Sequence, residues 1–159
     1  MYSRNAVLAF AGTLLVAASG FAQSTTASTH TRTSDLSPVG LAVGETVQVN
    51  VANLAANSTS GTAASCAGSV SFYNASGAII GAATTFTLTT GQISTVRLPY
   101  ASAGASGSRT VVRPVVTLTT TLPSPPPCSL QFSLETFDTA TGVTHVHTDG
   151  GVLQGGFVR

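Results

Sequence analysis

The sequence predicts an all-β fold, an antiparallel β-sandwich of about seven or eight strands. Three observations support this prediction. Apolar and polar residues alternate with a period of two through most of the chain after residue 38, and turn-forming residues separate these runs at short intervals. No stretch after residue 22 repeats its apolar residues with the 3.6-residue period of an α-helix.

The N-terminal segment 1–22 is interpreted as a signal peptide. Arg4 supplies a positive charge, Ala6–Ala18 is an apolar run, and Gly20-Phe21-Ala22 offers small residues for cleavage after Ala22. A helix that spans a bilayer needs about 20 apolar residues, more than this run contains, so a permanent transmembrane anchor is the less favoured alternative. We therefore expect a protein that is secreted or periplasmic.

Residues 23–38 are predicted to be a flexible leader. More than half of them are Ser or Thr, and Leu36 is the one larger apolar residue. Such a composition buries too little apolar surface to offset the entropy of ordering. We expect the sandwich to occupy residues 39–153 and residues 154–159 to form a flexible tail. The chain left after cleavage is long enough for one domain with its own core.

The predicted strands follow one another with turns or loops between them. Val47, Val49 and Val51 show the pattern best, because polar residues separate them. The expected strands are Val39–Val43, Thr46–Val51, Ser69–Tyr73, Ala78–Leu88, Ile93–Leu98, Arg109–Thr121, Leu130–Leu134 and Val143–Thr148, the last of which Val152 and Leu153 lengthen.

Two residues inside these strands predict irregularities. Gly81 indicates a bulge or bend within Ala78–Leu88. Pro114 cannot donate a hydrogen bond to a neighbouring strand, which places its strand at a sheet edge or its position at a bulge. The final hairpin is the other candidate edge.

Cys66 and Cys128 are the two cysteines of the chain. An even pair in an exported protein predicts a disulfide, and free thiols are the alternative. Four strands lie between the cysteines, and an even number of reversals in an up-and-down arrangement returns the chain to the end where it started. We therefore expect both cysteines at the same end of the sandwich. A closed loop of about 60 residues stabilises a fold by about 4 kcal/mol.

Three segments resemble secreted bacterial immunoglobulin-like or fibronectin-like domains: GETVQVNVANL (44–54), GAIIGAATTFTLTTGQ (77–92) and SLETFDTATG (133–142). The resemblance covers Val39 to Val152 and implies the same β-sandwich. Antibody domains pack a core tryptophan against their disulfide, and this chain has no Trp. The resemblance thus implies a disulfide at the rim of the sandwich and carries no antibody-like recognition.

His145, His147 and Asp149 form the candidate metal site. Residues two apart on a strand project from the same face, so the two imidazoles could share a zinc or copper ion, with Glu135 or Asp138 across the hairpin completing the site. A polar strip on a solvent-facing strand is the alternative interpretation.

Composition and motifs exclude several functional classes. The chain has no lysine and no basic cluster, which argues against nucleic-acid binding. It contains no sequence motif of a hydrolase or a nucleotide-binding protein, so we expect neither catalysis nor a cofactor.

The expected function is that of a non-catalytic structural or adhesion-type interaction module, which would bind a protein or cell-surface partner through its loops or an edge strand. A small exported metal-binding protein is the first alternative, and an extracytoplasmic enzyme is the second.

Overall fold

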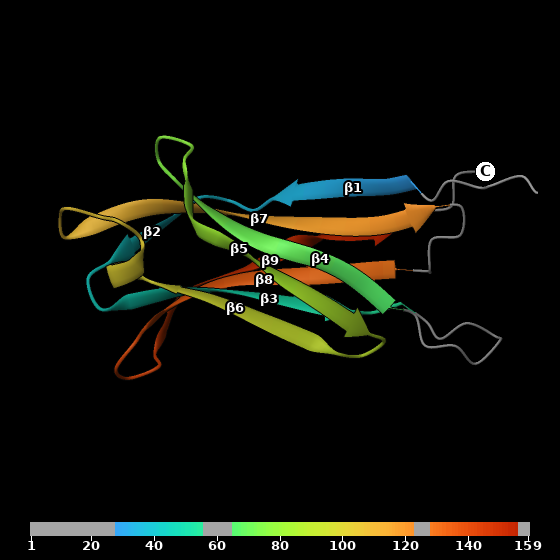
Figure 1. Ribbon diagram of the computed structural model, residues 1–159. Coiled ribbons are helices and arrows are strands. Elements are labelled where there is room, and N and C mark those ends of the chain that lie inside the picture. Colours follow the sequence, from blue (N-terminus) through green and yellow to red (C-terminus); the bar gives the residue numbers. More distant parts are fainter. Residues whose placement is uncertain (1–27, 56–64, 123–127, 156–159) are drawn as a thin grey trace, which may run out of the picture.

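The computed structural model describes residues 28–55, 65–122 and 128–155, which form two antiparallel sheets (Figure 1). The strands of sheet A are β1 (Ser28–Asp35), β2 (Val39–Ala42), β4 (Ser65–Asn74), β5 (Ile79–Thr89) and β7 (Arg109–Leu122). The strands of sheet B are β3 (Glu45–Asn53), β6 (Ile93–Pro99), β8 (Cys128–Asp138) and β9 (Thr144–Gly155). The predicted all-β sandwich is confirmed.

Sheet A has the order β1-β7-β4-β5, with β2 also paired to β7, and sheet B has the order β6-β3-β8-β9. A single turn of 3₁₀ helix, η1 (Tyr100–Ser102), is the helical element of the described ranges. Nothing helical in those ranges has the length and apolarity needed to cross a bilayer.

The core lies between the inner faces of the two sheets. The predicted alternation of β3 is confirmed, because Val47, Val49 and Val51 are fully buried. The buried side chains that pack with them include Leu130, Phe132 and Leu134 of β8, Val70 and Phe72 of β4, and Val112, Val116 and Leu118 of β7. Burial of this apolar surface is the main force that holds the sheets together.

The disulfide between Cys66 and Cys128 is present, with the two Cα atoms 5.4 Å apart. Cys66 lies near the start of β4 in sheet A and Cys128 at the start of β8 in sheet B, at the same end of the sandwich (Figure 1). Both cysteines are buried and belong to the core cluster. The bridge therefore joins the two sheets at one end of the core, and both cysteines lie within strands and not in the loops before them.

Regular structure begins nearer the N-terminus than the composition of the chain predicts. Ser28–Asp35 forms β1, and each of its residues pairs with a residue of β7. Main-chain hydrogen bonds to β7 hold this polar strand in place, although it buries little apolar surface. The buried Leu36 fixes its end. The expected flexible leader is thus wrong for residues 28–35. At the other end, β9 extends to Gly155, beyond the expected boundary at 153. Residues 1–27 and 156–159, which include the expected signal peptide and its cleavage site, lie outside the described residues.

Pro114 lies in an interior strand, because β7 has β4 on one side and β1 and β2 on the other. Pairing of β1 with β7 ends at Val115, and pairing of β2 begins at Val112. The Leu36 N–H donates to the Pro114 carbonyl at 3.0 Å. The nitrogen and the carbonyl of one strand residue point to the same side, so the nitrogen of Pro114 also faces the gap between β1 and β2. The predicted edge position was therefore wrong, and the proline is accommodated by a break in the neighbouring strand. The final hairpin does supply an edge, since β9 pairs with β8 alone.

Gly81 produces the predicted irregularity in β5. Its φ is 69°, a left-handed conformation that glycine adopts without a steric penalty. Pairing with β4 shifts register between Val70 and Phe72, opposite this part of β5. Because β5 continues beyond Gly81 as one strand, four strands separate the cysteines, as the disulfide prediction requires.

A second irregularity lies in β9, where Gly150 and Gly151 face Phe132. Pairing of β8 with β9 shifts register between Gln131 and Ser133, so the two glycines form a bulge. A Cβ atom on Gly150 would lie 2.5 Å from the carbonyl oxygen of Phe132, whereas the nearest atom to a Cβ on Gly151 would be 3.8 Å away. Close packing thus requires a glycine at position 150 but not at position 151.

We expect Gly150→Ala to lower the free energy of unfolding by about 1–3 kcal/mol, because the added methyl group displaces backbone in a packed core. Gly151→Ala is the matched control and should change it by less than about 1 kcal/mol. Urea unfolding followed by fluorescence or circular dichroism measures both. Equal losses for the two variants would contradict the packing at Gly150.

Candidate functional site on the outer face of sheet B

The outer face of sheet B carries a network of polar side chains. Gln48 of β3 lies at its centre, between Arg97 of β6 and Glu135 of β8, its partners in register. Arg97 Nε donates to Gln48 Oε1 at 2.5 Å, and Gln48 Nε2 donates to Glu135 Oε1. A cation and an anion are thereby connected through one neutral amide.

Asn50 extends this network along β3. Its amide nitrogen donates to Glu135 Oε1 at 3.2 Å and to Ser133 Oγ at 3.4 Å. Its carbonyl oxygen accepts hydrogen bonds from Gln48 Nε2 and from Thr95 Oγ1, both at 3.0 Å. Four strand residues therefore hold the Asn50 side chain in one orientation.

Arg97 is also placed by an aromatic ring. Its guanidinium carbon lies 5.7 Å from the centroid of the Phe137 ring, within the range of a cation–π interaction. Gln48 beneath it is buried although it lies on the outer face. Side chains that cover and bond one another in this way lose little entropy when a ligand binds.

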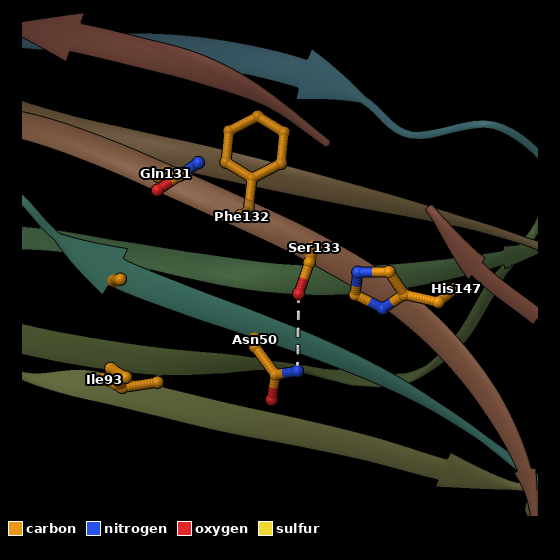
Figure 2. A pocket seen from close by; sticks show the side chains of 7 residues that line it. Asn50, Ile93, Gln131, Phe132, Ser133 and His147 are labelled. Carbon is orange, nitrogen blue, oxygen red and sulfur yellow. Dashed lines mark hydrogen bonds between the residues drawn. The ribbon is translucent and has the colours of Figure 1, made fainter. Parts of the chain in front are cut away.

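A shallow hollow of about 410 Å³ opens beside the network. Its lining comes from the four strands of sheet B and consists of Asn50, Ala52, Ile93, Gln131, Phe132, Ser133 and His147. Figure 2 shows the Ser133 hydroxyl directed at the Asn50 amide, with the His147 ring on the same side of the sheet. Ile93 is 67 % exposed, the largest fraction among the large apolar residues of the described chain. The hollow thus combines amide, hydroxyl and imidazole groups with one apolar side.

The candidate metal ligands have separate surroundings. His145 Nδ1 donates to Glu45 Oε1 at 2.6 Å, next to the turn between β2 and β3. His147 pairs in register with Glu135 and lines the hollow. A register shift between Thr136 and Phe137 interrupts the two-residue alternation at this part of β9. The regular strand geometry on which the shared site was predicted is therefore absent.

The other three predicted metal ligands also lie in separate surroundings. Asp149 pairs through its backbone with Ser133, and its side chain lies outside the described part. Glu135 belongs to the network of Gln48 and Asn50. Asp138 accepts hydrogen bonds within its own turn from Thr141 and Ala140. Within the ranges that the structure describes, no three His, Cys, Asp or Glu side chains are grouped closely enough to hold a metal ion.

Hydrogen bonds govern the ionisation of two carboxyl groups near this turn. The backbone N–H of Ala42, at 2.7 Å, and then His145 lower the pKa of Glu45 below its ordinary value. The backbone N–H and hydroxyl of Thr141 likewise lower the pKa of Asp138. Both groups are thereby favoured as carboxylates.

Comparison of the chain with models of known protein families, with curated proteins and with solved structures gave no significant match.

Sequence reasoning did not identify the network as a site. Thr46, Gln48 and Asn50 are recognisable as the polar side of β3, but their partners come from strands that are distant in the sequence. One signal was available, because two long amide side chains facing outward from a valine-rich strand indicate a covered polar face. Their partners could be named only after the strand order was known.

We expect the difference in unfolding free energy between the wild-type chain and Glu45→Gln to depend on pH. The lowered pKa means that the Glu45 carboxylate stabilises the fold above pH 4.5, its ordinary value, and that this contribution is lost as the pH falls through the lowered pKa. The variant should be less stable by about 0.5–1 kcal/mol at pH 7, a range already reduced for solvent screening.

Chemical unfolding at several pH values measures this difference. His145→Gln is the control. The Ala42 N–H still binds the Glu45 carboxylate in this variant, so the difference in unfolding free energy between His145→Gln and Glu45→Gln should keep most of its pH dependence. A difference between wild type and Glu45→Gln that stays constant from about pH 7 to about pH 3 would contradict the assignment.

Proposed function

We propose that the chain is a secreted or periplasmic, non-catalytic interaction module that binds its partner on the outer face of sheet B. The observation that supports this proposal is the network of Arg97, Gln48, Glu135 and Asn50 beside the hollow. A β-sandwich supplies the rigid support, and the outer face of its sheet supplies the binding groups.

Preorganisation is the physical reason to assign binding to this face. Asn50 and Gln48 are held by bonds to neighbouring strands, so they need no reordering when a partner arrives. The charges of Arg97 and Glu135 are balanced across Gln48, which favours a neutral polar ligand over a strongly charged one.

The hollow indicates the size and character of that ligand. Its volume of about 410 Å³ falls in the lower part of the range of small-ligand sites. Gln131, Ser133 and His147 offer hydrogen-bonding groups, and Ile93 offers an apolar contact. A neutral side chain or a small polar group of a larger partner fits this combination.

The proposed export and the immunoglobulin-like class rest on further features. A buried disulfide between two sheets is typical of domains that fold in oxidising compartments. Two antiparallel sheets with a common apolar core are compatible with the immunoglobulin-like class.

A metal-binding role is the alternative that one observation favours. The Glu45 carboxylate and the His145 imidazole, two ligand types that zinc accepts, lie 2.6 Å apart. Zinc titration of the purified chain, compared with His145→Ala and His147→Ala, decides between this role and the binding module. Micromolar binding that His145→Ala abolishes and His147→Ala preserves would favour the metal at the Glu45–His145 pair.

We expect Gln131→Arg to weaken binding of the purified chain to the surface of the cells that produce it by about tenfold or more, because it places a bulky charge in the hollow. Thr87→Arg is the matched control, since Thr87 is exposed on the outer face of sheet A and should bind like wild type. Binding isotherms of the labelled chain measure both. Equal affinity for wild type and Gln131→Arg would contradict the assignment of this face.

A further inference from the structure

The two sheets have four lateral edges: β1 and the four-residue β2 share one edge of sheet A, β5 forms its other edge, and β6 and β9 form the edges of sheet B. The exposed backbone of an edge strand can pair with another chain, and proteins oppose this with bulges or with inward-pointing charges. The four edges of this sandwich differ in whether they carry such a feature.

Bulges interrupt two of the edges. The pairing of β9 with β8 shifts register at two places, and the pairing of β5 with β4 shifts once, opposite Gly81. Each shift twists the strand locally and breaks the regular row of donors and acceptors. These shifts divide β9 into short runs, whereas β5 keeps residues 84–89 in unbroken register with β4.

The β1 edge is protected by a charge. Arg32 is paired with Leu118, a buried residue, so its side chain lies on the inner side of sheet A. Its Nη1 donates to the carbonyl oxygen of Gln154 in β9 at 2.8 Å. The guanidinium thus links the edge strand β1 of sheet A to the edge strand β9 of sheet B.

The β6 edge carries neither feature. Its seven residues pair with β3 without a register shift, from Thr46 with Pro99 to Ala52 with Ile93. Its inward residues Val96 and Leu98 are apolar and buried. Among the edge strands of the described chain, β6 is therefore the longest that keeps one register along its whole length and carries no inward-pointing charge.

Hydrogen bonds at the end of β3 show which backbone groups of β6 face outward. The Asn53 N–H donates to the Gln92 carbonyl at 3.0 Å, so odd-numbered residues of β3 direct their backbone groups toward β6. The Leu54 N–H donates to Ser129 of β8 at 2.8 Å, which gives the even-numbered residues the opposite direction.

The same alternation applies to β6. Ser94, Val96 and Leu98 are opposite odd-numbered residues of β3 and bond with them, so Ile93, Thr95 and Arg97 direct N–H and C=O groups away from the sheet. Pro99 shares this direction but lacks an N–H, which ends the row of donors.

We propose that this edge pairs with β6 of a second copy of the chain, antiparallel, about a two-fold axis at Thr95. Thr95 then lies opposite its own counterpart, and Ile93 lies opposite Arg97 of the second copy. Each of these residues both donates and accepts a main-chain hydrogen bond. The two sheets B become one continuous sheet across the dimer.

The side chains support a second copy as the occupant. Threonine pairs and apolar contacts across strands are favourable, and the aliphatic part of arginine can cover the exposed Ile93. Gln48 and the Phe137 ring hold the Arg97 guanidinium over its own sheet. The two Arg97 residues are four positions apart along the paired strands, about 13 Å, so they do not repel one another closely.

One short strand buries less surface than a standard interface of about 1,200–2,000 Å². The dimer is therefore weak and depends on concentration. This inference goes beyond the proposed function, because it uses the backbone of β6, although the second copy also covers Ile93 at the apolar side of the hollow.

Sedimentation velocity of the oxidised chain tests the proposal between about 10 µM and about 1 mM, with the mass expected to rise from one chain toward two. Thr95→Pro removes an outward N–H, and Thr95→Lys places a charge on the edge, so both should remain monomeric. Thr95→Val keeps the N–H and the branched side chain and should dimerise like wild type. Circular dichroism and thermal unfolding confirm that each variant is folded.

Amide hydrogen exchange locates the pairing. The N–H groups of Ile93, Thr95 and Arg97 should exchange more slowly at high concentration, while those of Ser94 and Val96 stay protected throughout. A monomer at every concentration, or a dimer that Thr95→Pro and Thr95→Lys leave intact, would overturn the proposal. Gln131→Arg, which tests the outer face, should leave the mass unchanged, so the two proposals fail separately.

Discussion

The two sheets bury their apolar faces against each other, and the Cys66–Cys128 bridge is the covalent bond that joins them. At this end of the molecule β4 and β8 begin side by side, and the buried disulfide fixes their separation. The outer face uses the register of β3 with β8, and β8, which carries Glu135, is the strand that the bridge anchors to sheet A.

The outer face and the β6 edge represent two ways of using one sheet. The face presents side chains whose hydrogen bonds are largely satisfied among themselves, which gives a rigid neutral surface. The edge presents unpaired N–H and C=O groups. Such groups can pair with a regular strand of another chain unless a bulge or a charge prevents the pairing. Both surfaces belong to sheet B, and the Arg32 contact between β1 and β9 lies on the opposite side of the sandwich.

The sequence predicted the features that depend on local alternation. The valines of β3, the bend at Gly81 and the pairing of the cysteines follow from residue spacing and from counting strands. Features that depend on distant strands were missed or misplaced. The polar segment 28–35 is ordered by pairing with β7, and Pro114 is accommodated where β1 gives way to β2, neither of which composition reveals. The partner of His145 proved to be Glu45, far earlier in the chain.

The most direct test of the account is the free energy of unfolding of the wild-type chain compared with the double variant Cys66→Ala/Cys128→Ala, measured in urea without reductant. If the bridge constrains both sheets, the double variant loses about 4 kcal/mol, as expected for a closed loop of this length. Equal stability of the two proteins, or two free thiols in the wild-type chain under oxidising conditions, would contradict the account.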